Sequence, residues 1–199
     1  VRLAGGPADD EYLREAPRYW RPGMAPTGAE LVELDRSNPD MKAAWDEVVA
    51  LATRECALNV LRVHVLQDPT RWKAYNLKKA HLAAKLPGGA NERRVFHGGA
   101  EASIRNIARQ GFIREYNQIS RFGKGTYFAR DMSYSANNRY TPPNASGEKF
   151  AFLARVLVGE PCVGTQGMNM PDVKPGGALH DSMVNNLADP SIFVLSSGS

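Results

Sequence analysis

Cysteine is scarce in this sequence, which has only two among 199 residues, Cys56 and Cys162. Neither belongs to a C-x-x-C or histidine-paired pattern, so the sequence predicts no disulfide framework and no metal site. We interpret both as reduced, buried thiols of an intracellular protein. No apolar run approaches the roughly 20 residues of a membrane span, and no signal-peptide pattern opens the chain. These absences favour a nuclear or cytoplasmic protein that acts away from membranes.

A strong charge of either sign is also lacking. The sequence has 25 Lys and Arg against 21 Asp and Glu, a formal net charge of +4. An excess of this size fits an anionic ligand or partner but does not require one, because a solvated surface has the same composition. The basic residues form no stripe interleaved with aromatic residues, which makes a nucleic-acid-binding protein the least favoured function class.

Length and composition predict a single folded domain. A chain with 43% hydrophobic residues can bury one sizeable core. Frequent glycine and proline over residues 1–30 predict an irregular N-terminal lead-in, and residues 31–199 are expected to form the domain. Because the chain starts at Val1 rather than at a methionine, we expect a monomeric domain of a longer polypeptide.

The hydrophobic pattern predicts short strands separated by short helices. Helices are expected after Asn38-Pro39, after Asp68-Pro69, around Ile104–Ala108 up to Gly111, and over 133–140. Strands are expected over 61–65, up to His97, over 123–129, over 150–158 and over 191–195. Because these elements lack a regular β-α-β spacing, the predicted fold class is α+β rather than a doubly wound sheet.

Two motifs carry most of the information in the chain. The first is Phe96-His97-Gly98-Gly99; the second is Gly123-Lys124-Gly125-Thr126-Tyr127-Phe128-Ala129, followed by Ser133-Tyr134-Ser135. They place an imidazole and a phenol on two short apolar runs that are expected to be neighbouring strands. The flanking glycines let a flat ligand approach the backbone closely. This arrangement suits a dinucleotide whose aromatic end is held by its edge and its face together.

The ordered series of motifs resembles the poly(ADP-ribose) polymerase family of ADP-ribosyltransferases, and most closely its mono-ADP-ribosylating branch. The resemblance covers roughly residues 55–195. It implies the ADP-ribosyltransferase fold, with mostly antiparallel sheets and short flanking helices. It further implies NAD as co-substrate, nicotinamide as leaving group, and catalytic positions at His97, Tyr127 and Ile192.

The resemblance also implies a role for each residue of the donor site. Breaking the bond between nicotinamide and ribose passes through an oxocarbenium-like state, so the protein has mainly to orient the ribose and hold nicotinamide. His97 is expected to bind a ribose, Gly98 and Ser135 the carboxamide, and Tyr127 and Tyr140 the two faces of the ring. Single histidines and tyrosines in such positions usually belong to a core, but their occurrence together favours a site.

Three features depart from the polymerases of the family. Ile192 lies where they carry a glutamate, and an aliphatic side chain cannot act as a general base, so single-unit transfer is expected instead of elongation. Gly99 replaces a common Ser or Thr and removes a hydroxyl on the adenosine side. The chain stops at Ser199, before a closing strand of the family, so we expect an edge strand with unpaired backbone groups near Ile192.

The predicted function is mono-ADP-ribosyl transfer from NAD to a macromolecular acceptor, most often a protein, with nucleic acid left open as an acceptor. Residues 112–122 are expected to form a flap over the donor, and residues 159–177 to face the acceptor. The alternative is a catalytically silent module that binds NAD, ADP-ribose or a partner, which Gly99 and Ile192 favour. An arginine-modifying relative is disfavoured because the chain contains no Glu-x-Glu.

Overall fold

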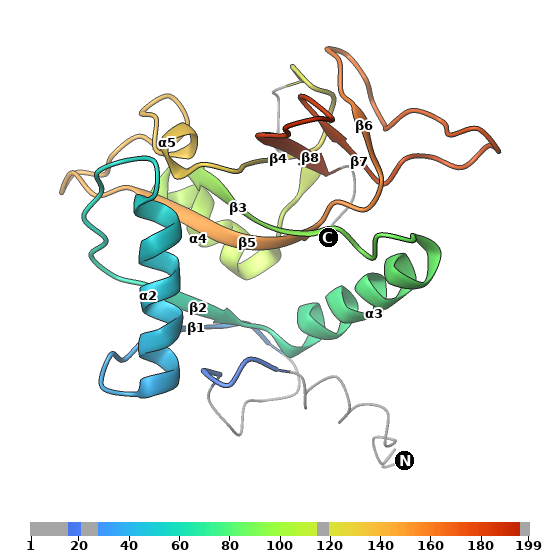
Figure 1. Ribbon diagram of the computed structural model, residues 1–199. Helices are drawn as coiled ribbons and strands as arrows, with labels where there is room; N and C mark the ends of the chain where they lie inside the picture. The colour runs from blue at the N-terminus through green and yellow to red at the C-terminus, as the bar shows by residue number, and fades with distance from the viewer. Residues whose placement is uncertain (1–15, 21–27, 115–119, 196–199) are drawn as a thin grey trace, which may run out of the picture.

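The chain folds into a mixture of short helices and strands, seen in the computed structural model of Figure 1. Residues 16–20, 28–114 and 120–195 are described, so most of the predicted lead-in 1–30 lies outside the described residues. The strands are β1 (Glu30–Glu33), β2 (His64–Gln67), β3 (Glu92–Gly99), β4 (Thr126–Ala129), β5 (Phe150–Leu157), β6 (Pro161–Val163), β7 (Ser182–Val184) and β8 (Ile192–Leu195). The helices are α2 (Pro39–Thr53), α3 (Pro69–Lys85), α4 (Glu101–Gln110) and α5 (Met132–Ser135).

The described strands form two sheets. A six-stranded sheet has the order β5-β3-β4-β8-β7-β6, and β1 pairs with β2 in a separate two-stranded sheet. All neighbours are antiparallel except β6 and β7, which are parallel. In Figure 1 the small sheet lies below β5, between α2 and α3. The predicted α+β class with mostly antiparallel sheets is therefore confirmed.

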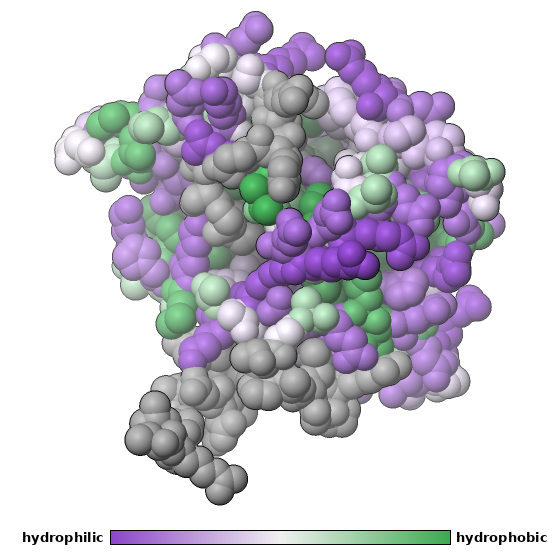
Figure 2. All heavy atoms as spheres, turned by 180° about the vertical axis from the view of Figure 1, so that it is seen from behind, coloured by the Kyte–Doolittle hydropathy of each residue, from purple (hydrophilic) through white to green (hydrophobic). Residues whose placement is uncertain are grey.

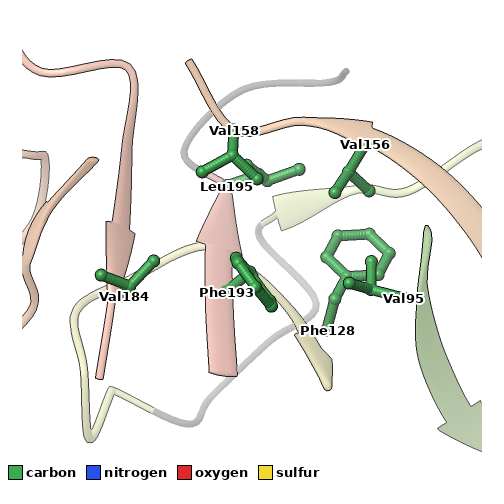
Figure 3. Packing of buried hydrophobic residues seen from close by; sticks show 7 residues of the cluster. All are labelled: Val95, Phe128, Val156, Val158, Val184, Phe193 and Leu195. Atoms are coloured by element: carbon green, nitrogen blue, oxygen red, sulfur yellow. The ribbon is translucent and has the colours of Figure 1, made fainter. Parts of the chain in front are cut away.

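The larger sheet separates two apolar clusters. Because successive side chains of a strand point to opposite faces, β8 sends Phe193 and Leu195 to one cluster and Ile192 and Val194 to the other. Figure 3 shows the first cluster, in which the labelled side chains converge from five strands and the segment after β5. Its buried members are Val95, Phe128, Val156, Val158, Val184, Phe193 and Leu195. Each large apolar side chain buried in this way contributes roughly 1.5–3 kcal/mol.

The predicted helix starts are confirmed by their caps. The side chain of Asn38 accepts from the backbone N–H of Asp40 and Met41 at 3.0 and 3.2 Å, and that of Asp68 accepts from the N–H of Arg71 at 2.9 Å. The predicted stop of α4 at Gly111 is also observed, since Gly111 has a φ of 88° that favours glycine.

The predicted and the observed elements differ in several places. The predicted strand 61–65 begins only at His64, because β1 has four residues and its pairing with β2 ends there. The predicted helix 133–140 is the single turn α5; the Ser135 carbonyl accepts from the Thr141 hydroxyl at 2.6 Å. The strands β1, β6 and β7 were not predicted from the sequence.

The expectation of an edge strand near Ile192 is wrong. β8 lies between β4 and β7 and pairs with both, so Ile192 belongs to an interior strand. The edges of the six-stranded sheet are instead β5 and β6.

Both cysteines were expected to be buried. Cys162 is buried, whereas Cys56 is only partly buried.

The pairing of β3 with β4 is unusually short and positions the site. Within these described strands the antiparallel register joins a single pair, Phe96 and Ala129. Beyond it, Gly98 extends toward the side of Tyr127, and Glu92–Val95 extends past the end of β4. Within the described strands, the ladder between β3 and β4 is therefore not continued on either side of this pair.

The face seen from behind is mainly polar. Figure 2 shows the rear face, where hydrophilic side chains predominate and hydrophobic ones form small separate groups. Among the described helices, none combines the length and the apolar character that a membrane crossing requires.

Candidate functional site

His97 lies near the end of β3 and is held as a neutral ring. Its Nδ1 lies 2.8 Å from the carbonyl oxygen of Tyr127, and because a carbonyl can only accept, Nδ1 carries the proton. Burial lowers the pKa of His97, and the hydrogen bond to Tyr127 opposes this only in part. The ring also contacts Phe112 edge-on, with centroids 5.0 Å apart. The remaining nitrogen, Nε2, is therefore an acceptor.

Tyr127 lies on β4 with its hydroxyl bound to the preceding turn. The hydroxyl accepts from the N–H of Phe122 at 2.9 Å and donates to the carbonyl of Gly123 at 2.7 Å. Burial raises the pKa of Tyr127, and the hydrogen bond from Phe122 lowers it in part. Since both bonds hold the phenol oxygen, this tyrosine can serve a ligand through its ring and not through its hydroxyl.

Gly98 and Ser135 lie against each other. A Cβ on Gly98 would collide with the Ser135 carbonyl and with the Thr141 hydroxyl, so no other residue fits there. The Ser135 hydroxyl donates to the carbonyl of Phe96 at 3.3 Å. Thr141 is fully buried and fixes the Ser135 carbonyl. Thr141 was not predicted from the sequence, because its role depends on the turn after α5 that places its hydroxyl beside Gly98 and the Ser135 carbonyl.

Tyr140 packs against Tyr134, which sequence reasoning left without a role. The two rings are stacked, with centroids 5.0 Å apart and planes at 22°, and their hydroxyl oxygens are 3.0 Å apart. Burial, together with the hydrogen bond to Tyr140, raises the pKa of Tyr134 to about 12. The ring partner of Tyr140 in this structure is therefore Tyr134 and not Tyr127.

Ile192 faces the same side of the sheet as Tyr127. It pairs with Ala129 across β4 and β8 and is 5% exposed. Its cluster contains other buried apolar residues, with Tyr127 packed against it. Among the hydrogen bonds of the described residues, the link between the His97 ring and this cluster is the bond from Nδ1 to the main-chain carbonyl of Tyr127.

Gly99 leaves room for a side chain. A Cβ there would lie 3.4 Å from the nearest atom of Ile104, an ordinary contact. The contacts of a Cβ therefore do not require glycine at this position.

The two segments expected to form the donor flap and the acceptor-facing loop are joined. Arg114 donates to the carbonyl of Asn169 at 2.7 Å, and the N–H of Gly167 donates to the carbonyl of Ser120 at 3.3 Å. Within the predicted flap, residues 115–119 lie outside the described residues. Figure 1 shows the connection between β6 and β7 projecting from the sheet.

Lys174 anchors that projecting connection to the end of β5. Its side chain is 11% exposed, and its Nζ lies 2.8 Å from Glu160 and 3.5 Å from Asp181. The hydrogen bond with Lys174 lowers the pKa of Glu160, and the same bond raises the pKa of Lys174. This ion-pair cluster fixes the base of the loop.

The chain matches known proteins over most of its length. The family model of the poly(ADP-ribose) polymerase catalytic domain matches residues 46–178. The chain is 33% identical over 90% of its length to the human protein mono-ADP-ribosyltransferase PARP14, of which it spans 10%. It is 32% identical over 92% of its length to human PARP12, of which it spans 26%, and 30% identical over 90% of its length to mouse PARP11, of which it spans 60%. Both are likewise named protein mono-ADP-ribosyltransferases.

Proposed function

Because the chain belongs to the poly(ADP-ribose) polymerase catalytic-domain family, we propose that it transfers single ADP-ribose units from NAD to a macromolecular acceptor and releases nicotinamide. We propose a protein as the main acceptor, as the names of the relatives suggest, with nucleic acid as a second class. Action as a monomeric domain inside the cell is part of the same proposal and rests on the same analogy.

The observation that carries the proposal is the contact between Gly98 and Ser135. A primary carboxamide needs an acceptor for its N–H groups and a donor for its oxygen. The backbone of Gly98 carries one of each, and the Ser135 hydroxyl, which donates to the Phe96 carbonyl at 3.3 Å, can also accept. Since a Cβ on Gly98 would collide with this turn, glycine is what lets β3 approach the turn that carries Ser135 so closely.

His97 supports the proposal by its tautomer. With Nδ1–H bound to Tyr127, the neutral ring presents Nε2 as an acceptor for a ribose hydroxyl. Tyr127 and Tyr140 would hold the nicotinamide ring, whose positive charge on a tyrosine face contributes roughly 1–2 kcal/mol where water is excluded. The bond from the ribose carbon to nicotinamide then breaks with its electron pair on nicotinamide, and the acceptor nucleophile bonds to that carbon and loses its proton.

Ile192 supports transfer of one unit. Its cluster of described residues is apolar, so no carboxylate stands there to activate a hydroxyl of a bound ADP-ribose. Transfer to an acceptor that brings its own nucleophile does not need a carboxylate at this position. Elongation does need one, because a hydroxyl of the bound ADP-ribose must be activated.

The test is incubation of the chain with labelled NAD and a protein acceptor. We expect labelled acceptor carrying single units and free nicotinamide, and both should be lost in Ser135→Ala and Gly98→Ala. The matched control is Ser133→Ala, which changes a serine of the same turn outside the proposed clamp.

A second candidate, a silent NAD-binding module, is favoured by Gly99 and Ile192. Binding of NAD with no nicotinamide release in the unaltered chain would establish that reading and overturn transfer. Products longer than one unit would overturn the single-unit assignment while leaving transferase activity.

A further inference from the structure

A groove lies at the opposite end of β3 from the proposed donor site. Its volume is about 510 Å³, within the range of roughly 300–1,000 Å³ common for ligand clefts. Its described lining comes from the end of α2, from β3, from the segment after β4 and from the turn before β8, which can be followed in Figure 1. The lining residues are Leu51, Arg54, Glu92–Phe96, Arg130, Ala188–Pro190 and Phe193.

One wall of this groove is a strand edge without a partner. β4 joins β3 at Phe96 and the chain then turns away, so Glu92–Val95 has a strand, β5, on one side alone within the described part of the chain. In an antiparallel strand, alternate residues direct their N–H and C=O groups to each side. Such an edge is the template on which an extended peptide adds by main-chain hydrogen bonds.

The rim of the groove is rich in arginine. Arg93 is exposed and donates to the side chain of Asn91 at 2.9 Å, and among the described residues it has no acidic partner. The other arginines face acids: Arg54 pairs with Asp131 and Glu55, Arg94 with Glu47, and Arg130 with Asp131 and Asp189. Of the two acids in the lining, Glu92 is held by Lys79.

The pair between Arg130 and Asp189 shows how the groove receives a carboxylate. Asp189 stands on the turn before β8, its side chain is 75% exposed, and it lies 2.5 Å from the Arg130 guanidinium. An exposed pair of this kind contributes little to stability, so another carboxylate can take its place at small cost. Beside it, Leu51 is partly exposed, while Val95 and Phe193 are buried beneath the groove as members of the first apolar cluster.

We propose that this groove binds an extended acidic peptide, which adds as a strand to the Glu92–Val95 edge. Its carboxylates bind Arg93 and Arg130, and an apolar side chain lies over Leu51. A free edge gives affinity through the main chain, and the arginines select acidic side chains through bidentate hydrogen bonds. This docking function goes beyond transfer and does not depend on it.

The experiment measures fluorescence anisotropy of fluorescein-labelled Val-Glu-Val-Asp-Val-Glu with the chain, without NAD. We expect saturable binding that Arg93→Glu weakens at least about tenfold and that Asp189→Asn strengthens about threefold, because the first reverses a charge and the second removes a competing carboxylate. The matched control is Lys42→Glu, the same charge change on an exposed residue of α2, which should leave binding unchanged.

Two further probes separate a peptide strand from a plain anion. A peptide with lysine at each acidic position and a peptide N-methylated at alternate amides should both lose binding. Equal binding of the N-methylated peptide, equal competition by pyrophosphate, or binding of single-stranded RNA with the same sensitivity to Arg93→Glu would each overturn the proposal. Arg93→Gln, with its melting temperature measured, provides a milder variant if Arg93→Glu does not fold. Loss of nicotinamide release does not bear on this binding assay, so the two proposals fail separately.

Discussion

The buried ring of His97 ties the stability of the protein to pH. Its pKa in the folded state lies below the ordinary value of 6.5 because burial disfavours the charged ring. At a pH well above 6.5 the ring is neutral in both the folded and the unfolded state. As the pH falls below it, the unfolded chain binds a proton that the folded chain resists, so folding is progressively disfavoured until the folded ring also titrates.

We therefore expect the free energy of unfolding to fall between pH 7 and pH 5, with a contribution from His97 of at most about 1.4 kcal/mol per pH unit. Urea denaturation at intervals across this range measures it. His97→Gln should show a flatter profile, and the exposed His81→Gln is the control for loss of a histidine. If His97→Gln keeps the full slope, the ring does not carry this dependence.

Tyr140 is the residue whose ring we expect to bind nicotinamide with Tyr134 as its support. Tyr140→Ala should weaken benzamide about tenfold, or roughly 1.4 kcal/mol, through loss of stacking. Tyr134→Phe keeps the stacked ring and loses the contact between the two hydroxyls, so its effect should be smaller. Isothermal titration of both variants measures this difference. Unfolding of Tyr140→Ala would show instead that Tyr140 serves the core.

Residue types and spacing were enough to propose the members of a site but not to predict all of the contacts that these residues make. From the sequence, Gly98 and Ser135 were both expected to bind the carboxamide, and in the structure these two residues lie against each other. The support from Thr141 and Tyr134 could not be predicted, because it comes from a one-turn helix followed by turns, where the expected longer helix would have placed these side chains elsewhere.

At the scale of elements, a strand with strong alternation was predictable and the three-residue strands were not. β5 has eight residues, all of them apolar except Arg155, and its bounds differ from the prediction by one residue. β6 and β7 have three residues each, too few for a period of two to be distinguished, and their pairing depends on the tertiary fold, in which β7 lies between β6 and β8.

The loop between β6 and β7 depends on Lys174. In Lys174→Met the ion pairs with Glu160 and Asp181 are lost while the aliphatic bulk remains. We expect backbone amides of 160–181 to exchange hydrogen about fivefold faster, as loss of roughly 1 kcal/mol predicts. Hydrogen exchange by mass spectrometry measures this, with Lys42→Met as the control. Unchanged exchange would show that the loop is held by its main-chain bonds alone.

The interior position of β8 decides what Ile192→Glu can do. The variant places a carboxylate in an apolar cluster, where burial raises its pKa and costs roughly 1–3 kcal/mol of stability. We expect products that are still one unit long, at equal or lower yield, because elongation also requires an acceptor ADP-ribose held in register. Gel analysis of labelled products measures chain length, and Ile192→Gln separates size from charge. Longer products from Ile192→Glu alone would make Ile192 the only barrier to elongation.

For the whole molecule, the single short pairing of β3 with β4 is the organising feature. The prediction of α+β architecture followed from the alternation of elements, but the sheet order could not follow from it, since β8 comes last in the chain and lies in the middle of the sheet. Within the described strands β3 pairs with β4 only at Phe96, and the proposed nicotinamide site and the arginine-rimmed groove lie on opposite sides of this pair along β3.

A ligand of the proposed donor site should stabilise the entire fold. Gly98 lies on β3, and Ser135 lies on the helix α5 that packs against β3 and β4. A ligand held between them therefore binds the folded state alone. Benzamide at about 100 times its dissociation constant adds roughly 2.7 kcal/mol, or about 5–10 °C in Tm for a chain of this size. Differential scanning fluorimetry measures the shift. Benzoate, which has no amide N–H, should give little shift, and Ser135→Ala should reduce the shift with benzamide. Equal shifts with both compounds, or none with benzamide at saturation, would contradict the amide site.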